Sequence, residues 1–548
     1  MVPDAPIDGK LPSVKPEDRS GDFIFSRGSN LAATRVNKDS LIEKGRENLL
    51  LQSNQFDTTW TKSNATLTSG QSGYDGSLDA WLLSKTGTGT LKQELTQSGV
   101  QSFSIYAKAG TSNWIRLLIN GVALAYYDLS NGVVGTTSYS TFIDANIESV
   151  GGGWYRCSLV GSGSTSLVNI VVANADNDVS NTSGSIYIQD AQLEQGLVAT
   201  EYIDTTTATV QKGILENLPR LDYSGSASCP SLLLEPQRTN ILAYSEGMFD
   251  SSNFTPFLGI SVEGQQTDLN GTNTAVKLSN FVQNSARLDY NTTVAAVDGK
   301  TYTYSAYYKG SGDIRINVSA STGVGGAGEK TITLTNEWVR HSVTTTFSSP
   351  TGNVKSHLAI TRTANNDAEV YLCFAQIEEG SYPTSYIPTY GSSVTRSQDV
   401  CNGAVDATNF NDSEGVLYAE IAALADDGTF RNISVNNGTT AQSVRIYYRN
   451  TANKITALIG SSSGGGVTVN VANLYTFNKI ALVYQNDNAK LFVNGILEGT
   501  IQGITMPTGL NQLDFNIAGV LPFYGKAKEV IYFPTALTDD ECIALTTI

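Results

Sequence analysis

Hydrophobic and polar residues alternate with a period of two through most of this chain, in short runs separated by Gly, Asn and Asp. Residues 112–119 and 313–318 are two such runs. Asn-Gly pairs at 120–121 and 131–132 follow runs of this kind, which is a strong hairpin signal. Short strands recur every eight to twelve residues and long helical periodicity is absent. The pattern predicts an all-β fold built from β-sandwiches.

Two long stretches of the chain repeat the same order of motifs. Asn48-Leu-Leu-Leu-Gln-Ser opens the first and Asn240-Ile-Leu-Ala-Tyr-Ser opens the second. Inside them Trp154-Tyr-Arg matches Trp338-Val-Arg, and both close on an Ala-Gln-x-Glu run. A spacing of nearly two hundred residues is too long for a solenoid repeat and suits duplicated domains. Repeated recognition modules multiply weak affinities, which favours binding over catalysis.

The motifs divide the chain into segments whose boundaries we predict as follows. These are an extended anchoring arm at 1–22, a leader at 23–47, module 1 at 48–207, a second part of the leader at 208–239, module 2 at 240–396 and a C-terminal domain at 397–548. Module 1 is then an insertion within the leader, which requires that its two ends lie close together. The four prolines of the arm predict an extended segment, either laid on a partner or a floppy tail. Thr538 with Glu541 forms a capping box, so a short terminal helix should begin there.

Composition excludes several classes of partner. Only 16% of the 548 residues are charged and the formal net charge is −16, which argues against nucleic acid and against an anionic membrane surface. The five cysteines are widely spaced and form no Cys-x-x-Cys pair, so neither a disulfide framework nor a metal site is indicated. The first residues lack a basic and apolar signal, and no apolar run is long enough to cross a bilayer. We therefore expect the chain to be made and folded in a cytoplasm.

The repeated motifs resemble a known group of domains. Asn48-Leu-Leu-Leu-Gln-Ser, Trp154-Tyr-Arg-Cys-Ser and the run at 375–380 with Pro383-Thr-Ser-Tyr-Ile-Pro resemble the jelly-roll, carbohydrate-binding-module-like domains of tailed-phage virion proteins. The stretch 22–37 resembles the leader ahead of such modules, most of all in phages of Bacteroidetes, including the crAss-like group. Residues 397–548 are similar to a concanavalin A-like, laminin-G-type lectin domain, through 491–495 and 530–539.

This resemblance implies a bacteriophage structural protein on the virion surface, a subunit of a tail or head fibre or appendage. The arm would contact other virion proteins, and the sandwiches would attach to host cell-surface carbohydrate. A homo-oligomer, either a dimer or a trimer, would supply the valency. The alternative is a purely structural virion protein, whose sandwiches mediate oligomerisation and contacts with other virion proteins.

Sugar binding in such domains would need aromatic faces with hydrogen-bonding groups beside them. Our candidates are Trp81, Trp114 and Tyr126 in module 1, Tyr307 and Tyr308 in module 2, and Tyr447, Tyr448 and Tyr524 in the C-terminal domain. Trp114 is the preferred residue of module 1 because it has no obvious aromatic counterpart in module 2. Trp154 and Trp338 recur at equivalent positions, which is typical of core residues.

Calcium is common in both of the resembled folds, and no other cofactor is expected. Asp426 and Asp427 lie in one oxygen-rich loop and Asp487 in another, so these carboxylates are the candidate ligands. Asp is expected at such turns in any case, because its side chain hydrogen-bonds nearby backbone groups.

Signals for an enzyme are nearly absent, and we expect none. The only histidines are His341 and His357, and His341 is replaced by Cys157 in the other repeat. Glu378 and Glu379 are adjacent on a predicted strand, so they point to opposite faces and cannot together flank a glycosidic bond. A depolymerase or glycosidase is the least favoured of the three hypotheses.

Overall fold

The computed structural model describes residues 10–11, 21–28, 31–224, 228–247, 254–257, 260–281, 287–322, 328–360, 369–460 and 466–548. The predicted arm at 1–22 lies mostly outside the described residues. Almost all described elements are strands, which confirms the predicted all-β fold. The helix α1 (Asp539–Thr546) begins after Thr538 with the predicted capping box, so that prediction is also confirmed. No described helix is both long and apolar enough to cross a membrane.

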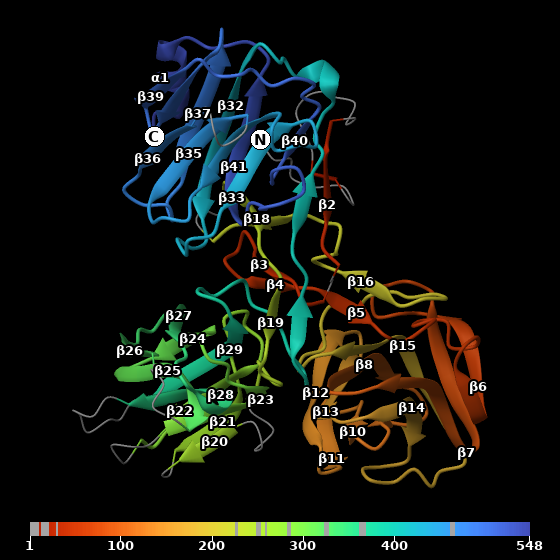
Figure 1. Ribbon diagram of the computed structural model, residues 1–548. Coiled ribbons are helices and arrows are strands. Elements are labelled where there is room, and N and C mark those ends of the chain that lie inside the picture. Colours follow the sequence, from red (N-terminus) through yellow and green to blue (C-terminus); the bar gives the residue numbers. More distant parts are fainter. Residues whose placement is uncertain are drawn as a thin grey trace.

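The described strands form three β-sandwich bodies around a central junction. Figure 1 shows the C-terminal domain in blue above, with module 1 in orange and module 2 in green below it. The leader and the 208–239 segment, red and yellow, run between the three bodies. The strands at the junction are β1 (Lys10–Leu11) of the arm, β2 (Phe23–Ser26), β3 (Thr34–Val36), β4 (Ile42–Lys44), β5 (Arg46–Asn48), β16 (Val210–Lys212), β17 (Arg220–Asp222), β18 (Ser231–Leu234), β19 (Arg238–Asn240), and β30 (Val394–Arg396) from the end of module 2.

Module 1 is a sandwich whose two layers are joined by one long strand. Its strands are β6 (Thr61–Gln71), β7 (Ala80–Gln97), β8 (Val100–Ala109), β9 (Trp114–Ile119), β10 (Ala123–Asp128), β11 (Val133–Ser138), β12 (Phe142–Gly151), β13 (Trp154–Ser162), β14 (Thr165–Ala173) and β15 (Gly184–Gln195). The pairing order is β11-β10-β9-β14-β7-β15-β8-β13-β12, with β6 beside β7. The first half of β7 pairs with β15 and the second half with β14, so β7 belongs to both layers.

Glycine lets β7 make this crossing beside β6. The register between the two strands shifts around Asn64, where β7 carries a Gly-rich stretch. A Cβ atom at Gly89 would collide with the Asn64 carbonyl oxygen, so only glycine fits this close approach of two backbones.

Module 2 has the same sandwich plan with two separate sheets. Its strands are β20 (Phe254–Phe257), β21 (Ser261–Gln266), β22 (Ala275–Ser279), β23 (Arg287–Ala295), β24 (Thr301–Gly310), β25 (Asp313–Thr322), β26 (Gly328–Thr333), β27 (Val339–Thr346), β28 (Thr351–Ile360) and β29 (Val370–Glu379). One sheet has the order β20-β23-β28-β25-β26 and the other β21-β22-β29-β24-β27. Alternate side chains of both sheets, among them Tyr304, Ile316 and Leu358, fill the core between them.

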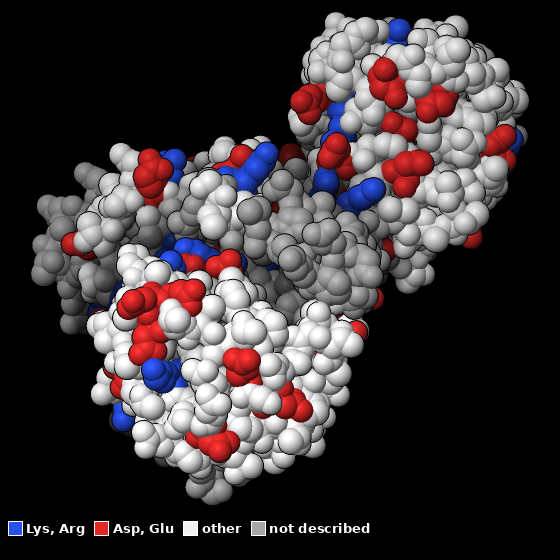
Figure 2. Space-filling view, turned by 90° about the horizontal axis from the view of Figure 1, so that it is seen from above, with Lys and Arg blue, Asp and Glu red and all other residues white. Residues whose placement is uncertain are grey.

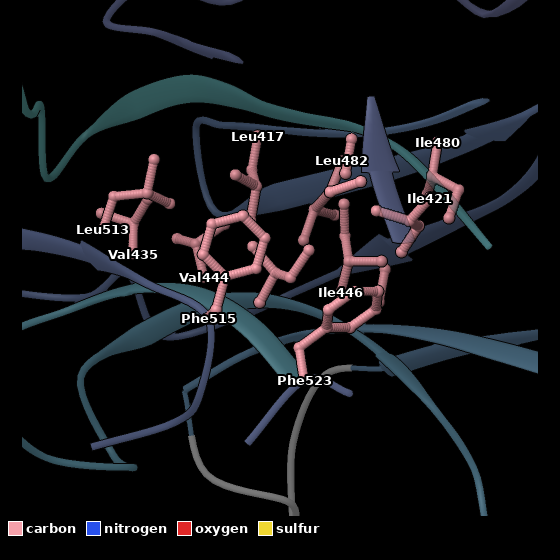
Figure 3. Close-up of a cluster of buried hydrophobic side chains, with 14 of the residues drawn as sticks. Leu417, Ile421, Val435, Val444, Ile446, Ile480, Leu482, Leu513, Phe515 and Phe523 are labelled. Carbon is pink, nitrogen blue, oxygen red and sulfur yellow. The ribbon is translucent and has the colours of Figure 1, made fainter. Parts of the chain in front are cut away.

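The C-terminal domain is a third sandwich. Its strands are β31 (Val400–Asn402), β32 (Glu414–Ala423), β33 (Arg431–Asn436), β34 (Ser443–Tyr448), β35 (Lys454–Ile459), β36 (Gly466–Asn470), β37 (Asn478–Gln485), β38 (Asn488–Val493), β39 (Ile496–Gln502), β40 (Gln512–Asp514) and β41 (Gly525–Phe533), with a short 3-10 helix at Ala407–Asn409. Figure 3 shows Leu417 and Leu482 from one sheet facing Val444 and Ile446 from the other, with Phe515 and Phe523 beside them.

Strands from the leader complete this third sandwich. One sheet has the order β17-β18-β41-β32-β37-β38-β39, so two strands of the 208–239 segment extend it. Strand β2 pairs with β31, and Phe23 and Phe25 are buried in the same core. The sandwich therefore takes in strands from before the predicted boundary at residue 397. Local patterning could not show this, because the pairing joins residues far apart in the sequence.

Each module is held on a two-stranded stem. Strand β5, which leads into module 1, pairs with β16, which leaves it. Strand β19 pairs with β30 at the ends of module 2 in the same way. The two ends of each module are thus adjacent in space, as an inserted domain requires.

A buried ion-pair cluster lies where the segments meet. Arg27 of the leader contacts Asp399 at 3.1 Å, and Arg220 contacts both Asp399 and, at 2.7 Å, Glu235. Arg396 contacts Glu235 at 2.9 Å. All five side chains are almost fully buried. Since a buried charge is costly without its partner, this cluster ties the leader to the 208–239 segment and to the link between module 2 and the C-terminal domain.

Candidate functional site

The outward face of strands β9, β10 and β14 in module 1 carries the best candidate site. Side chains alternate along β9, so Ile115, Leu117 and Ile119 enter the core while Trp114 and Arg116 face outward. Arg116 lies directly opposite Tyr126 on β10 and Val171 on β14. The structure therefore brings two of the predicted residues, Trp114 and Tyr126, to one face around an arginine that the sequence reasoning missed.

Two polar atoms of this face lack a hydrogen-bond partner within the described part of the chain. These are the buried Arg116 Nε and the buried Asn169 Oδ1. Asn169 lies opposite Leu118, so it is a diagonal neighbour of Arg116 on the same face. Buried donors and acceptors are costly to leave unpaired, which makes this a face that a polar ligand or ordered water would complete.

Trp114 is the aromatic ring that this face offers to a ligand. It is half-buried, whereas Tyr126 is only 4% exposed and forms the floor of the face. The indole packs closely on the backbone of β11, because a Cβ at Gly135 would lie 2.7 Å from Trp114 Cζ3. Asp176 holds the same stretch of β11 by accepting hydrogen bonds from Thr136 N and Oγ1 at 2.6 and 2.9 Å. The ring is thus supported from behind, which suits a stacking surface.

Arg116 and Lys85 bring positive charge to this face, beside the carboxylates of Asp128 and Asp176. Lys85 lies at its edge and donates from Nζ to the carbonyl oxygen of Val179 at 3.0 Å and to Asn181 Oδ1 at 2.8 Å. Burial, and then the charge of Arg116, lower the pKa of Lys85. The nearby carboxylate of Asp128 accepts hydrogen bonds from Ser130 and Asn131 of the turn that follows it. Figure 2 shows acidic side chains, with basic ones among them, scattered over a largely uncharged face of the molecule.

The structure buries three of the predicted sugar-binding residues in cores. Trp81 is 6% exposed, and its Nε1 donates to the Asn54 carbonyl oxygen at 2.9 Å. Tyr308 is 1% exposed and its hydroxyl hydrogen-bonds the Tyr304 hydroxyl at 2.7 Å. Tyr448 is also 1% exposed and packs near Phe523. On its own strand, each lies an even number of residues from the inward-facing residues and therefore points into the core. The aromatic character of a residue does not show to which face it points.

Three other predicted aromatic residues are half-buried. Tyr307 lies under Arg340, whose Cζ is 5.8 Å from the ring centroid. Tyr447 lies under Arg445 at 5.7 Å, and the buried Arg445 Nε has no partner among the residues described. Tyr524 donates from its hydroxyl to Gln398 Oε1 at 2.8 Å. Its hydroxyl is therefore already engaged by the linker before the C-terminal domain.

The sequence carried a signal for these arginines. Arg116 is two residues after Trp114, and Arg445 two residues before Tyr447, so each pair lies on one face of a strand. Arg340 belongs to the Trp-x-Arg motif that both repeats share. An aromatic residue and an arginine at i and i+2 on a predicted strand would have pointed to a combined site.

The candidate calcium ligands are engaged in other contacts where the structure shows them. Asp427 forms an ion pair with Arg431 at 2.7 Å and accepts from Ser381 Oγ at 3.0 Å. Asp426 accepts from the backbone N of Asn453 at 2.7 Å. Across the described ranges, no three Asp, Glu, His or Cys side chains come together as a metal site. Calcium binding by Asp426, Asp427 and Asp487 stays a prediction.

The glutamates at the end of each repeat have a structural role. Glu378 is fully buried and accepts from Thr384 N and Oγ1 at 2.8 and 2.7 Å, while Glu379 pairs at the surface with Lys300. Glu194 and Thr200 make the same contacts in module 1. Burial raises the pKa of Glu194 and of Glu378, although these hydrogen bonds oppose the shift.

Comparison with known proteins gives likeness in structure alone. No protein-family model and no curated protein matches the sequence. The chain is similar to the Ruminococcus gnavus IT-sialidase CBM40, with 23% identity over 26% of this chain and 93% of that one, at a TM-score of 0.23. It is also similar to the tandem CBM22 domains of Paenibacillus barcinonensis Xyn10C, with 11% identity over 61% and 98% of the chains, at 0.20. A third similar structure is mouse laminin alpha1 LG4-5, with 8% identity over 59% and 96%, at 0.19. The likeness is thus to carbohydrate-binding modules and to laminin G domains.

Proposed function

We propose that this chain is an adhesive protein of a bacteriophage virion surface that binds host carbohydrate through the outward face of β9, β10 and β14. The observation that carries the proposal is the grouping of Trp114, Arg116 and Asn169. A half-buried indole lies beside a donor and an acceptor that have no partner among the described residues. A pyranose ring has an apolar face for the indole and hydroxyls for both polar atoms.

The arrangement of the three sandwiches suits adhesion. One shallow face binds one or two sugar residues weakly, so useful affinity needs several copies on one particle. The buried ion pairs at the junction would keep the modules in a fixed orientation, which reduces the entropy lost on multivalent attachment.

The virion context of the proposal rests on the motifs at 22–37 and in the two repeats. In it the arm at 1–22 docks the chain to other virion proteins, and the chain forms a dimer or trimer in a tail or head fibre. The protein breaks no covalent bond in this function.

Binding of the purified protein to polysaccharide from host cells tests the adhesive function. We expect Trp114→Ala and Arg116→Gln each to weaken binding about tenfold or more, because each removes one side of the contact. Leu78→Ala is the matched control, since Leu78 is 73% exposed in a different loop of the same module. Unchanged binding in both site variants, or no binding when the protein is displayed in many copies, would leave the purely structural role as the function.

A further inference from the structure

Both repeats contain the same arginine–tyrosine pair, but the surroundings of the pair differ between them. In module 1, Arg156 of β13 lies opposite Tyr106 of β8, with its Cζ 5.5 Å from the ring centroid. In module 2, Arg340 of β27 lies opposite Tyr307 of β24 in the same way. The pairs correspond in sequence and in register, so module 1 is an internal reference for what module 2 lacks.

In module 1, other residues of the same module contact both members of the pair. Arg156 donates to the carbonyl oxygens of Ala199, at 3.2 Å, and Thr200. The ring of Tyr74 stacks on Tyr106 with centroids 3.8 Å apart and planes at 6°. A flat ring therefore covers the tyrosine, and oxygen acceptors engage the Nη atoms of the arginine.

In module 2 both of these features are missing. Among the described residues, Arg340 donates one hydrogen bond, from Nη2 to Ser305 Oγ at 2.9 Å. The Nε atoms of Arg340 and of Arg156 are both buried without a partner in the described part of the chain, so the two modules differ in the contacts of the Nη atoms. The turn that carries Tyr74 in module 1 carries Leu269 in module 2, each two residues before a glycine with positive φ. Leucine supplies neither a flat ring nor a hydroxyl.

A pocket of about 240 Å³ lies beside this pair. Besides Tyr307 and Arg340, it is lined by the leader hairpin β3–β4, by Pro383 and Ser385 of module 2, and by Lys526 of the C-terminal domain. Lys526 is already held by Asp222 Oδ2 at 2.7 Å and Ser224 Oγ at 2.5 Å. Arg340 is thus the lining cation with no carboxylate partner among the described residues.

We propose that this pocket binds the carboxylate of an acidic sugar residue, with Arg340 on the carboxylate and the apolar face of the sugar on Tyr307. The ligand would supply what Tyr74 and the two carbonyl oxygens supply in module 1. A guanidinium with free N–H groups is matched by a planar carboxylate. Asp222 and Glu235 also line the pocket, so a singly charged carboxylate is favoured over a doubly charged phosphate. This site is separate from the β9–β10–β14 face.

Hydrogen exchange on the unmodified full-length protein, with and without glucuronate, locates the site. We expect glucuronate to slow exchange in β3–β4 and at residues 383–386, and to leave β9 and β10 unchanged. Glucose and inorganic phosphate at the same concentration should slow none of these segments. Equal protection by glucose or phosphate, or protection confined to module 1, would overturn the proposal.

Calorimetric titration with glucuronate tests the role of Arg340. We expect Arg340→Gln to weaken binding about tenfold or more, since the carboxylate loses its charged donor. Arg315→Gln is the matched control, because Arg315 is a surface arginine of module 2 paired with Glu329. Undiminished affinity in Arg340→Gln would contradict the proposal. Trp114→Ala should leave this binding intact, so failure here and failure of the proposed adhesive function are distinguishable.

Discussion

Asn48 and Asn240 make the same four hydrogen bonds at the start of the two repeats. Asn48 Nδ2 donates to the carbonyl oxygens of Ala191 and Ile203, and Oδ1 accepts from the backbone N of Leu50 and Leu193. Asn240 does the same with Ala375, Ile387, Leu242 and Ile377. One fully buried amide therefore joins three backbone segments of each module, which explains why the Asn-x-Leu opening recurs with the closing Ala-Gln-x-Glu run.

Replacing either asparagine should destabilise its own module. Asn48→Ala and Asn240→Ala each leave buried backbone groups unpaired, and we expect a loss of about 2–4 kcal/mol in the stability of that module. Differential scanning calorimetry would show one transition lowered in each variant. Asn120→Ala is the control, since Asn120 hydrogen-bonds at the surface with Ser166 and its loss should stay within about 0.5 kcal/mol. Equal effects of all three variants would contradict this role.

Asp190 should make the stability of module 1 depend on pH. Burial, with the charges of Asp79 and Asp75, raises the pKa of Asp190 to about 7. The hydrogen bond from the Tyr74 hydroxyl, at 3.0 Å, opposes this shift. An unfolded aspartate has a pKa of about 4, so the unfolded chain loses this proton first as the pH rises. Stability should therefore fall between about pH 4 and pH 7, by at most about 4 kcal/mol, and then level off.

Asp190→Asn checks this dependence. Asparagine keeps the size of the side chain and tolerates the positive φ of 54° at this position. We expect the variant to be more stable than the natural protein at pH 8, with the difference shrinking toward pH 4. Thermal unfolding of both proteins across this range measures it. Parallel curves for the two proteins would show that Asp190 does not titrate in this way.

Breaking the junction cluster should loosen the arrangement of the sandwiches. Asp399→Ala leaves Arg27 and Arg220 without their shared carboxylate, and we expect a cost of about 3–5 kcal/mol. Small-angle scattering should show a larger and more variable particle, while circular dichroism keeps its β signal. Glu329→Ala breaks only a surface pair with Arg315 and should cost at most about 1 kcal/mol. An unchanged scattering curve for Asp399→Ala would count against this function of the cluster.

Gly135 should be needed for the position of Trp114. A Cβ atom there would press on Trp114 Cζ3 and on the Asp176 carboxylate, so Gly135→Ala should displace the indole. We expect glycan binding to fall about as far as in Trp114→Ala, with little change in the core. Thr137→Ala, at an exposed position of the same strand, is the control. Full binding by Gly135→Ala alongside loss in Trp114→Ala would contradict the packing argument.

The local features of this protein could be predicted from its sequence. Alternation predicted the strands, Asn-Gly pairs predicted turns, and the Thr538 capping box predicted α1, because each depends on residues close together in the chain. The duplication was also readable, since both copies need the same buried contacts around Asn48 and Asn240. Trp114 was predicted as a binding residue and does lie on an outward face.

Long-range packing determines which faces become cores and which segments complete which sandwich. The alternation of side chains predicts that Trp81 and Tyr308 point to one side of their strands. That side is the core because the second sheet of the sandwich packs against it. Strand β18 joins β41, and Arg27 meets Asp399, across separations of hundreds of residues that no local pattern reports. The partnerless atoms of Arg116 and Asn169 depend on the same long-range packing. Their burial without a partner is a property of the folded sheet and of no single segment.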